Sequence, residues 1–166
     1  MRFFISPDIK RNDLLKLIII FTTIFFLFLW LTNLLLFLKI GFNIEGIVEY
    51  YRGSEESFRP AKSYLGLLEE AHFHFFSMAI ILITLTHLIL FTDIRVIIKY
   101  LVIISSYTSA FFDIISGWLI RFVAPEFAYL KLISFVVLQL SILYLIVVVT
   151  LYLYKKNKTL KYNNVS

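Results

Sequence analysis

All three histidines of the chain, His72, His74 and His87, lie on one apolar segment together with Glu70. Histidine is the usual axial ligand of haem and, with carboxylates, a common ligand of zinc, copper and iron. Ionisable side chains at membrane depth cost roughly 2.5–3.5 kcal/mol each on insertion scales, and by default they suggest a functional site. We therefore expect the chemistry of this protein on that segment.

The histidine segment is one of four long apolar stretches. The chain has 166 residues, 60% of them hydrophobic, whereas soluble domains contain about 45–50%. Each stretch exceeds the roughly 20 residues that cross a bilayer, and backbone groups in lipid must be satisfied within the segment. The prediction is an all-α integral membrane protein, a single membrane domain over residues 1–166 that forms a four-transmembrane-helix bundle. The predicted helices cover residues 14–38, 65–91, 96–120 and 127–154.

The first loop, residues 41–62, is the largest segment outside the predicted spans. Within it, Ile44, Ile47, Val48 and Tyr51 recur at helical spacing, which predicts a short interfacial helix on the outer leaflet. Gly53 and Ser54 are expected to end it, and Ser63 to cap the next helix. We expect a disordered tail at residues 157–166.

The distribution of basic residues predicts the topology. Lysine and arginine are enriched beside the two termini and in the second loop, which favours both termini on the cytoplasmic side. Lys131, close to the third loop, is counted among the outer charges. The net charge of +5 sits at helix ends, so it indicates contact with a lipid bilayer and no nucleic-acid partner.

Several classes of chemistry are excluded by the sequence. Without cysteine, the chain cannot form disulfides, thiolate metal sites or a c-type haem attachment. A glycine-rich phosphate loop, a Ser-His-Asp arrangement and a metalloprotease motif are also missing. These absences favour a protein that is not an enzyme.

Depth along the helices predicts two polar layers. The outer layer contains Glu70, His72, His74, Asp113 and Asn33, whereas His87 lies alone near the inner end.

Rotation of the second span predicts which side chains face the bundle. Glu70, Ser77 and Thr84 share one heptad position, so they are expected to mark the buried seam, with His74 and His87 bordering it. His72 then points to roughly the opposite side from His74.

The first hypothesis for this site is b-type haem bound by His72, His74 and His87, used for electron transfer or for redox or ligand sensing. His87 is thirteen residues from His74 and fifteen from His72, which is roughly 20 Å along a helix and suits two stacked haems. Because no other span carries a histidine, bis-histidine ligation requires a homodimer through the second span. Electron transfer would also require a redox partner complex.

Three alternatives remain open. Glu70, His72, His74 and Asp113 could hold a zinc, copper or iron ion, although a His-x-His pair on a helix splays its rings apart. The same residues could form a proton or ion relay. The third alternative is a non-catalytic membrane assembly or scaffold subunit whose histidines are only hydrogen-bonded. Asp113 could itself pair with Arg121 or with a histidine.

A family resemblance rests on Tyr50–Glu56, Ser63, Leu67–Met78 with its Glu-Ala-His-Phe-His run, Thr86–Leu88, Asp113, Gly117, Trp118 and Pro125–Ala128. On these residues the chain resembles a family of small four-helix bacterial inner-membrane proteins of unestablished function, sometimes mislabelled as a translation elongation factor. The resemblance covers roughly residues 44–130 and implies a multi-pass protein of the bacterial inner (cytoplasmic) membrane, with a candidate site but no reaction. Soluble nucleotide-binding motifs, which a role in translation would need, are absent.

Overall fold

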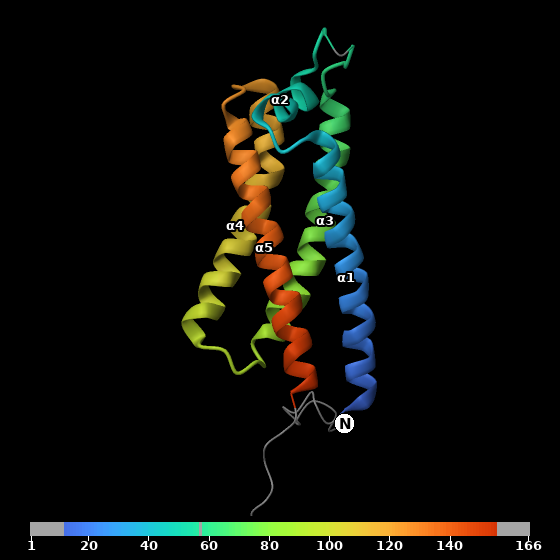
Figure 1. Ribbon diagram of the computed structural model, residues 1–166, viewed down its shortest axis with the longest axis vertical. Helices are drawn as coiled ribbons and strands as arrows, with labels where there is room; N and C mark the ends of the chain where they lie inside the picture. The colour runs from blue at the N-terminus through green and yellow to red at the C-terminus, as the bar shows by residue number, and fades with distance from the viewer. Residues whose placement is uncertain (1–11, 57, 156–166) are drawn as a thin grey trace, which may run out of the picture.

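Five α-helices make up the computed structural model, which describes residues 12–56 and 58–155. Four of the helices are long and apolar enough to cross a membrane, and Figure 1 shows them side by side with the short helix α2 across one end. The prediction of an all-α membrane bundle is therefore confirmed. The helices are α1 (Asp13–Ile40), α2 (Ile44–Arg52), α3 (Tyr64–Ile89), α4 (Val96–Phe122) and α5 (Phe127–Tyr154).

The helix ends agree with the predicted ones to within two residues because local capping chemistry fixes them. The Ser63 side chain accepts a hydrogen bond from the Gly66 N–H, as its residue type predicts. Asn12 and Asn43 cap α1 and α2 in the same way. Gly53 follows α2 with φ of +82°, a backbone conformation that favours glycine. The predicted disordered tail, 157–166, lies outside the described residues.

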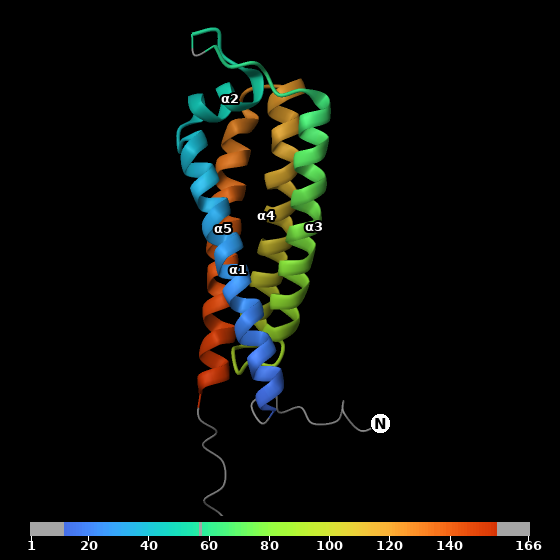
Figure 2. The same ribbon diagram turned by 90° about the vertical axis from the view of Figure 1, so that its right-hand side faces the viewer.

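The helices alternate in direction along the bundle. Figures 1 and 2 show α1 beginning and α5 ending at the same end, which we call the terminal end. The other end is called the α2 end. Helices α4 and α5 form the most extensive helix pair, and α4 buries Ser106, Ser109 and Ala110 in the bundle. Small residues let two backbones approach closely in lipid.

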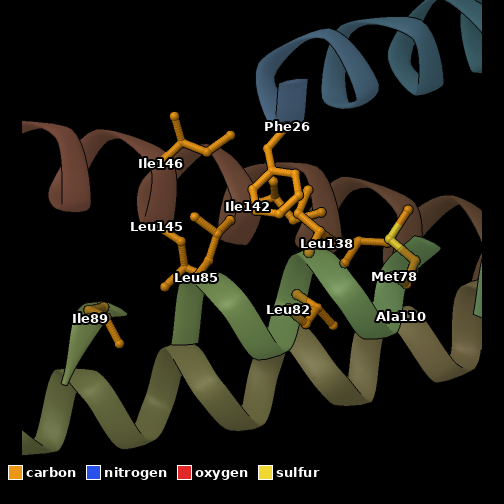
Figure 3. Close-up of a cluster of buried hydrophobic side chains, with 11 residues drawn as sticks. Phe26, Met78, Leu82, Leu85, Ile89, Ala110, Leu138, Ile142, Leu145 and Ile146 are labelled. Atoms are coloured by element: carbon orange, nitrogen blue, oxygen red, sulfur yellow. The ribbon is translucent and has the colours of Figure 1, made fainter. Parts of the chain in front are cut away.

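The buried seam of α3 differs from the predicted one. Figure 3 shows Met78, Leu82 and Leu85 of α3 packed against residues of α1, α4 and α5. The seam is therefore centred on Ala71, Met78 and Leu85, one residue beyond the predicted set of Glu70, Ser77 and Thr84. A shift of one residue rotates a helix by about 100°. Large apolar side chains fill the core, whereas the Ser77 hydroxyl donates to the Phe73 carbonyl of its own helix.

Helix α2, predicted as a short interfacial helix in the first loop, is present and packs its apolar face on the other helices of the bundle. Its Ile47 and Tyr51 are buried, and the helix contacts α4, α5 and α1. The last carbonyls of a helix have no partner within it. One of them, at Ile120 of α4, accepts from Arg52 Nε at 2.6 Å. Arg121 Nε in turn donates to the Lys62 carbonyl at 2.9 Å, which ties the linker after α2 to α4.

Candidate functional site

A buried ion pair joins α4 and α5. Lys131 Nζ lies 2.9 Å from Asp113 Oδ1, and the two side chains are 9% and 3% exposed. Lys131 also donates a hydrogen bond of 2.8 Å to the Asp113 main-chain carbonyl. The Lys131 ammonium is close enough to Asp113 Oδ1 to form an ion pair, but the two groups are not oriented for a hydrogen bond. Oδ1 therefore accepts no hydrogen bond from any group in the described chain.

Both charged groups lie inside the predicted membrane spans. Asp113 is nine residues before the end of α4 and Lys131 four residues after the start of α5, roughly 13 Å and 6 Å along their helices. A lysine side chain is long enough to bridge such a difference in height. The sequence interpretation, which gave Asp113 either Arg121 or a histidine as its partner, is therefore wrong.

A second, more exposed ion pair lies at the rim. Lys62 Nζ is 3.1 Å from Glu70 Oε2, with the two side chains 29% and 26% exposed. One turn further along α3, His74 Nδ1 lies 3.0 Å from the Glu70 main-chain carbonyl. A carbonyl can only accept, so we assign the ring proton to Nδ1, which leaves Nε2 of a neutral His74 as an acceptor.

Tyr51 of α2 covers this site from the α2 end. Its side chain is 2% exposed and lies against Gly117 of α4, where an added Cβ would come within 2.8 Å of the Tyr51 ring. Glycine at this position therefore permits the approach of α2. Together these side chains surround a cavity of about 10 Å³, which has room for about one water molecule. Its lining residues are Tyr51, Leu67, Glu70, Ala71, His74, Asp113, Ile114, Gly117 and Trp118.

Two groups at the α2 end, outside the spans, have shifted pKa values. Burial raises the pKa of Tyr51 well above its ordinary value; Lys131 opposes this shift, and Glu70 and Asp113 add to it. For Lys62, burial lowers the pKa, but the neighbouring Tyr50 and Glu70 side chains outweigh it and leave the pKa raised. The Lys62 ammonium also lies 4.4 Å from the centre of the Tyr50 ring.

The other two histidines lie outside this cavity. His72 is exposed and lines an apolar groove of about 650 Å³ with Leu68, Ala71, Phe75, Phe76, Ile115 and Trp118. His87, which was expected to border the seam, is exposed as well, because the one-residue rotation of α3 turns it outward. Its ring lies 5.4 Å from that of Phe91.

The side chains predicted as metal ligands are not gathered around one point. Glu70, His74 and Asp113 line the cavity, whereas His72 lines the groove. Within residues 12–56 and 58–155, His, Asp and Glu side chains do not form a group of three or more that could hold a metal ion. Asn33, predicted in the same polar layer, is not among the residues that line the cavity.

Sequence reasoning missed Lys131, Tyr51 and Gly117 as members of the site. Lys131 carried a usable signal because it is a lysine within a predicted span, opposite a span that contains a lone aspartate. Tyr51 and Gly117 carried a weaker one, because both occur in the residues that support the family resemblance.

Removing one member of the buried ion pair should destabilise the protein. We expect Asp113→Leu and Lys131→Met each to lower the free energy of unfolding by about 3–5 kcal/mol, since each leaves a buried charge unpaired. The double variant should recover to within about 1 kcal/mol of the wild type. Unfolding in detergent micelles measures these effects.

Lys155→Met is the matched control, because its ion pair with Asp93 at 2.8 Å is 63% and 65% exposed and should contribute less than about 1 kcal/mol. Single variants of the buried pair that cost no more than this control would contradict the prediction.

Alkaline pH should destabilise the α2 end. The folded protein keeps the Tyr51 and Lys62 protons to higher pH than the unfolded chain does, so the stability they contribute is present below pH 10 and is lost as pH rises above it. We expect the thermal unfolding midpoint to fall above pH 10, and to fall less steeply in Tyr51→Phe. Tyr64→Phe is the control, because Tyr64 is 64% exposed. Equal slopes in wild type and Tyr51→Phe would count against the burial of this hydroxyl.

Comparison with known proteins identifies a family of transmembrane helical domains that matches residues 41–160. This range contains α2 to α5 and every residue of the site. No curated protein and no solved structure matches the chain. Because the match covers more than half of the sequence, the chain belongs to this family of transmembrane helical domains.

Proposed function

We propose that this small polytopic membrane protein carries a proton relay at its α2 end, through which protons from the aqueous phase reach the buried Asp113–Lys131 pair. The observation that carries the proposal is the position of this pair inside the spans, with Asp113 lining the same small cavity as His74. Intramembrane ionisable residues often mark proton relays.

Stability alone is a weak reason to keep such a pair. A buried ion pair is often no more stabilising than well-packed apolar residues of the same size, because desolvation offsets the attraction between the charges. The pair is also electrically neutral, so one added proton changes its net charge from zero to +1. In a medium of low dielectric constant, this change in net charge has a large electrostatic energy, so it can alter how the two helices interact.

The proposed route starts at the rim. Glu70 and Lys62 are partly exposed, and His74 follows one turn deeper with Nε2 as its remaining acceptor. Histidine is the side chain best suited to exchange protons near neutral pH. A proton that binds His74 Nε2 passes to the Asp113 carboxylate, and His74 returns to its neutral form. The Lys131 ammonium then loses its counter-ion, and the pair separates.

The orientation belongs to the same proposal. The α2 end faces outward from a bacterial inner membrane, and the terminal end faces the cytoplasm. Support comes from the basic residues near the termini and in the second loop.

Infrared spectroscopy tests this function directly. When the pH is lowered, wild-type protein in lipid should gain the carbonyl band of a protonated carboxylic acid, and Asp113→Asn should lack that band. His74→Ala should slow its appearance after a pH jump by about tenfold or more. His72→Ala is the matched control, because His72 is exposed on the opposite side of the same helix. A band that persists in Asp113→Asn, or an equal delay in both histidine variants, would refute the relay.

A second candidate function is the binding of b-type haem between two copies of the chain. It is favoured by the exposure of both His72 and His87 on α3. They are fifteen residues apart, which is roughly 22 Å along the helix and roughly 60° around it. A cavity of about 10 Å³ beside His74 is far too small for haem, so this candidate depends on His72 and His87, with the second axial ligands from the other copy.

The visible spectrum of detergent-purified protein from haem-replete cells distinguishes this candidate. Haem between two copies predicts a Soret band on a dimer, lost in His72→Ala or His87→Ala and kept in His74→Ala. A colourless dimer, or a coloured monomer, would rule out the arrangement. Without either function, the scaffold role is what remains.

A further inference from the structure

We infer that the cavity between α2, α3 and α4 binds a single water molecule that bridges His74 and Asp113. The cavity measures about 10 Å³, close to the smallest volume that holds one water, and a buried water also needs two to four polar partners.

The polar groups on this cavity require a donor. Asp113 Oδ1 is buried and accepts no hydrogen bond from the described protein groups, and the carboxylate is 3% exposed. His74 has already committed its Nδ1 proton to the Glu70 carbonyl, so its Nε2 can only accept while the ring is neutral. Two acceptors cannot bond to each other, and water is the molecule of this size that donates two hydrogen bonds.

The surroundings supply the remaining contact and exclude larger ligands. The Tyr51 hydroxyl belongs to a third polar side chain on the cavity and can donate to the water oxygen. Glu70 and Trp118 also line the cavity, and its remaining walls, formed by Leu67, Ala71, Ile114 and Gly117, offer no polar side chain. A buried carboxylate oxygen without a donor costs free energy, and the bridging water removes that cost.

This inference rests on the proposed proton relay for its role but not for the binding itself. When His74 is protonated, its Nε2–H donates to the water oxygen, and the water donates to Asp113 Oδ1. The proton moves from Nε2 to the water while the water passes one of its own protons to the carboxylate. Atoms and charge balance, because the water is regenerated and the ring returns to neutral.

Filling the cavity tests the inference. Ala71 is 8% exposed and lines the cavity, so Ala71→Val should displace the water without removing a titratable group. The control is Ala79→Val, which places the same side chain at an exposed position of the same helix. Both variants carry the same helix-propensity penalty.

Two measurements separate the water from its role. Nuclear Overhauser contacts between a long-lived water and the His74 Hε1 proton should be present in wild type and Ala79→Val and absent in Ala71→Val. The appearance of the protonated Asp113 band after a pH jump should be about tenfold slower in Ala71→Val.

Each outcome then has a defined meaning. If wild-type protein shows no long-lived water beside His74, the inference is overturned, even where Asp113 still takes up a proton. If Ala71→Val loses the water but protonates Asp113 at the wild-type rate, the bridging role is overturned and binding stands. If the water is present but Asp113 never takes up a proton, the relay fails and the binding site remains.

Discussion

The ion pair between Lys131 and Asp113 is the interaction on which the rest of the α2 end depends. Lipid offers no water to a charged group, so an aspartate inside α4 has to find its counter-charge within the bundle. Lys131 provides it from the neighbouring helix and also bonds the main-chain carbonyl of the same aspartate. This double attachment sets the register of α4 against α5, and small residues such as Ser106 and Ala110 let the two helices approach.

The position of α2 follows from a second constraint, the unpaired carbonyls at the end of α4. Arg52 satisfies the carbonyl of Ile120, and Arg121 reaches the backbone of the linker after α2. These two bonds hold α2 across the bundle, with its apolar face against the other helices. Gly117 allows the Tyr51 ring of α2 to lie against α4, because any side chain at position 117 would displace that ring. The cavity is thus covered because Arg52 caps the end of α4 and because Gly117, which has no Cβ, leaves room for the Tyr51 ring.

Much of the fold could be predicted because lipid leaves so few solutions. Four apolar stretches of sufficient length must be helices, and Ser63 reveals one of their starts by its residue type. The rotation of α3 was predicted wrongly, because Glu70, Ser77 and Thr84 suggested a polar seam. In lipid the interior of a bundle still selects side chains by shape, and Met78 and Leu85 fill it better than serine and threonine do.

The partner of Asp113 illustrates a different limit. Lys131 stands in the first turns of a helix, where a lysine ordinarily extends toward the headgroups, and nothing in a single sequence separates that role from a contact across the bundle. The choice depends on the angle and height of α5 beside α4, which are properties of packing. A lone acidic residue in one span remains a reason to search neighbouring spans for a lysine.

The concentration of all histidines on α3 has a simple geometric consequence. One helix cannot present residues 72, 74 and 87 to the same place, because each step along it turns the side chain by about 100°. His74 therefore lines the cavity under α2, His72 lines the outer groove, and His87 faces outward at the terminal end. Each histidine has a separate environment, so the three were never one ligand set. The candidate site is therefore formed by several helices that meet at Asp113, and α3 contributes His74 and Glu70 to it.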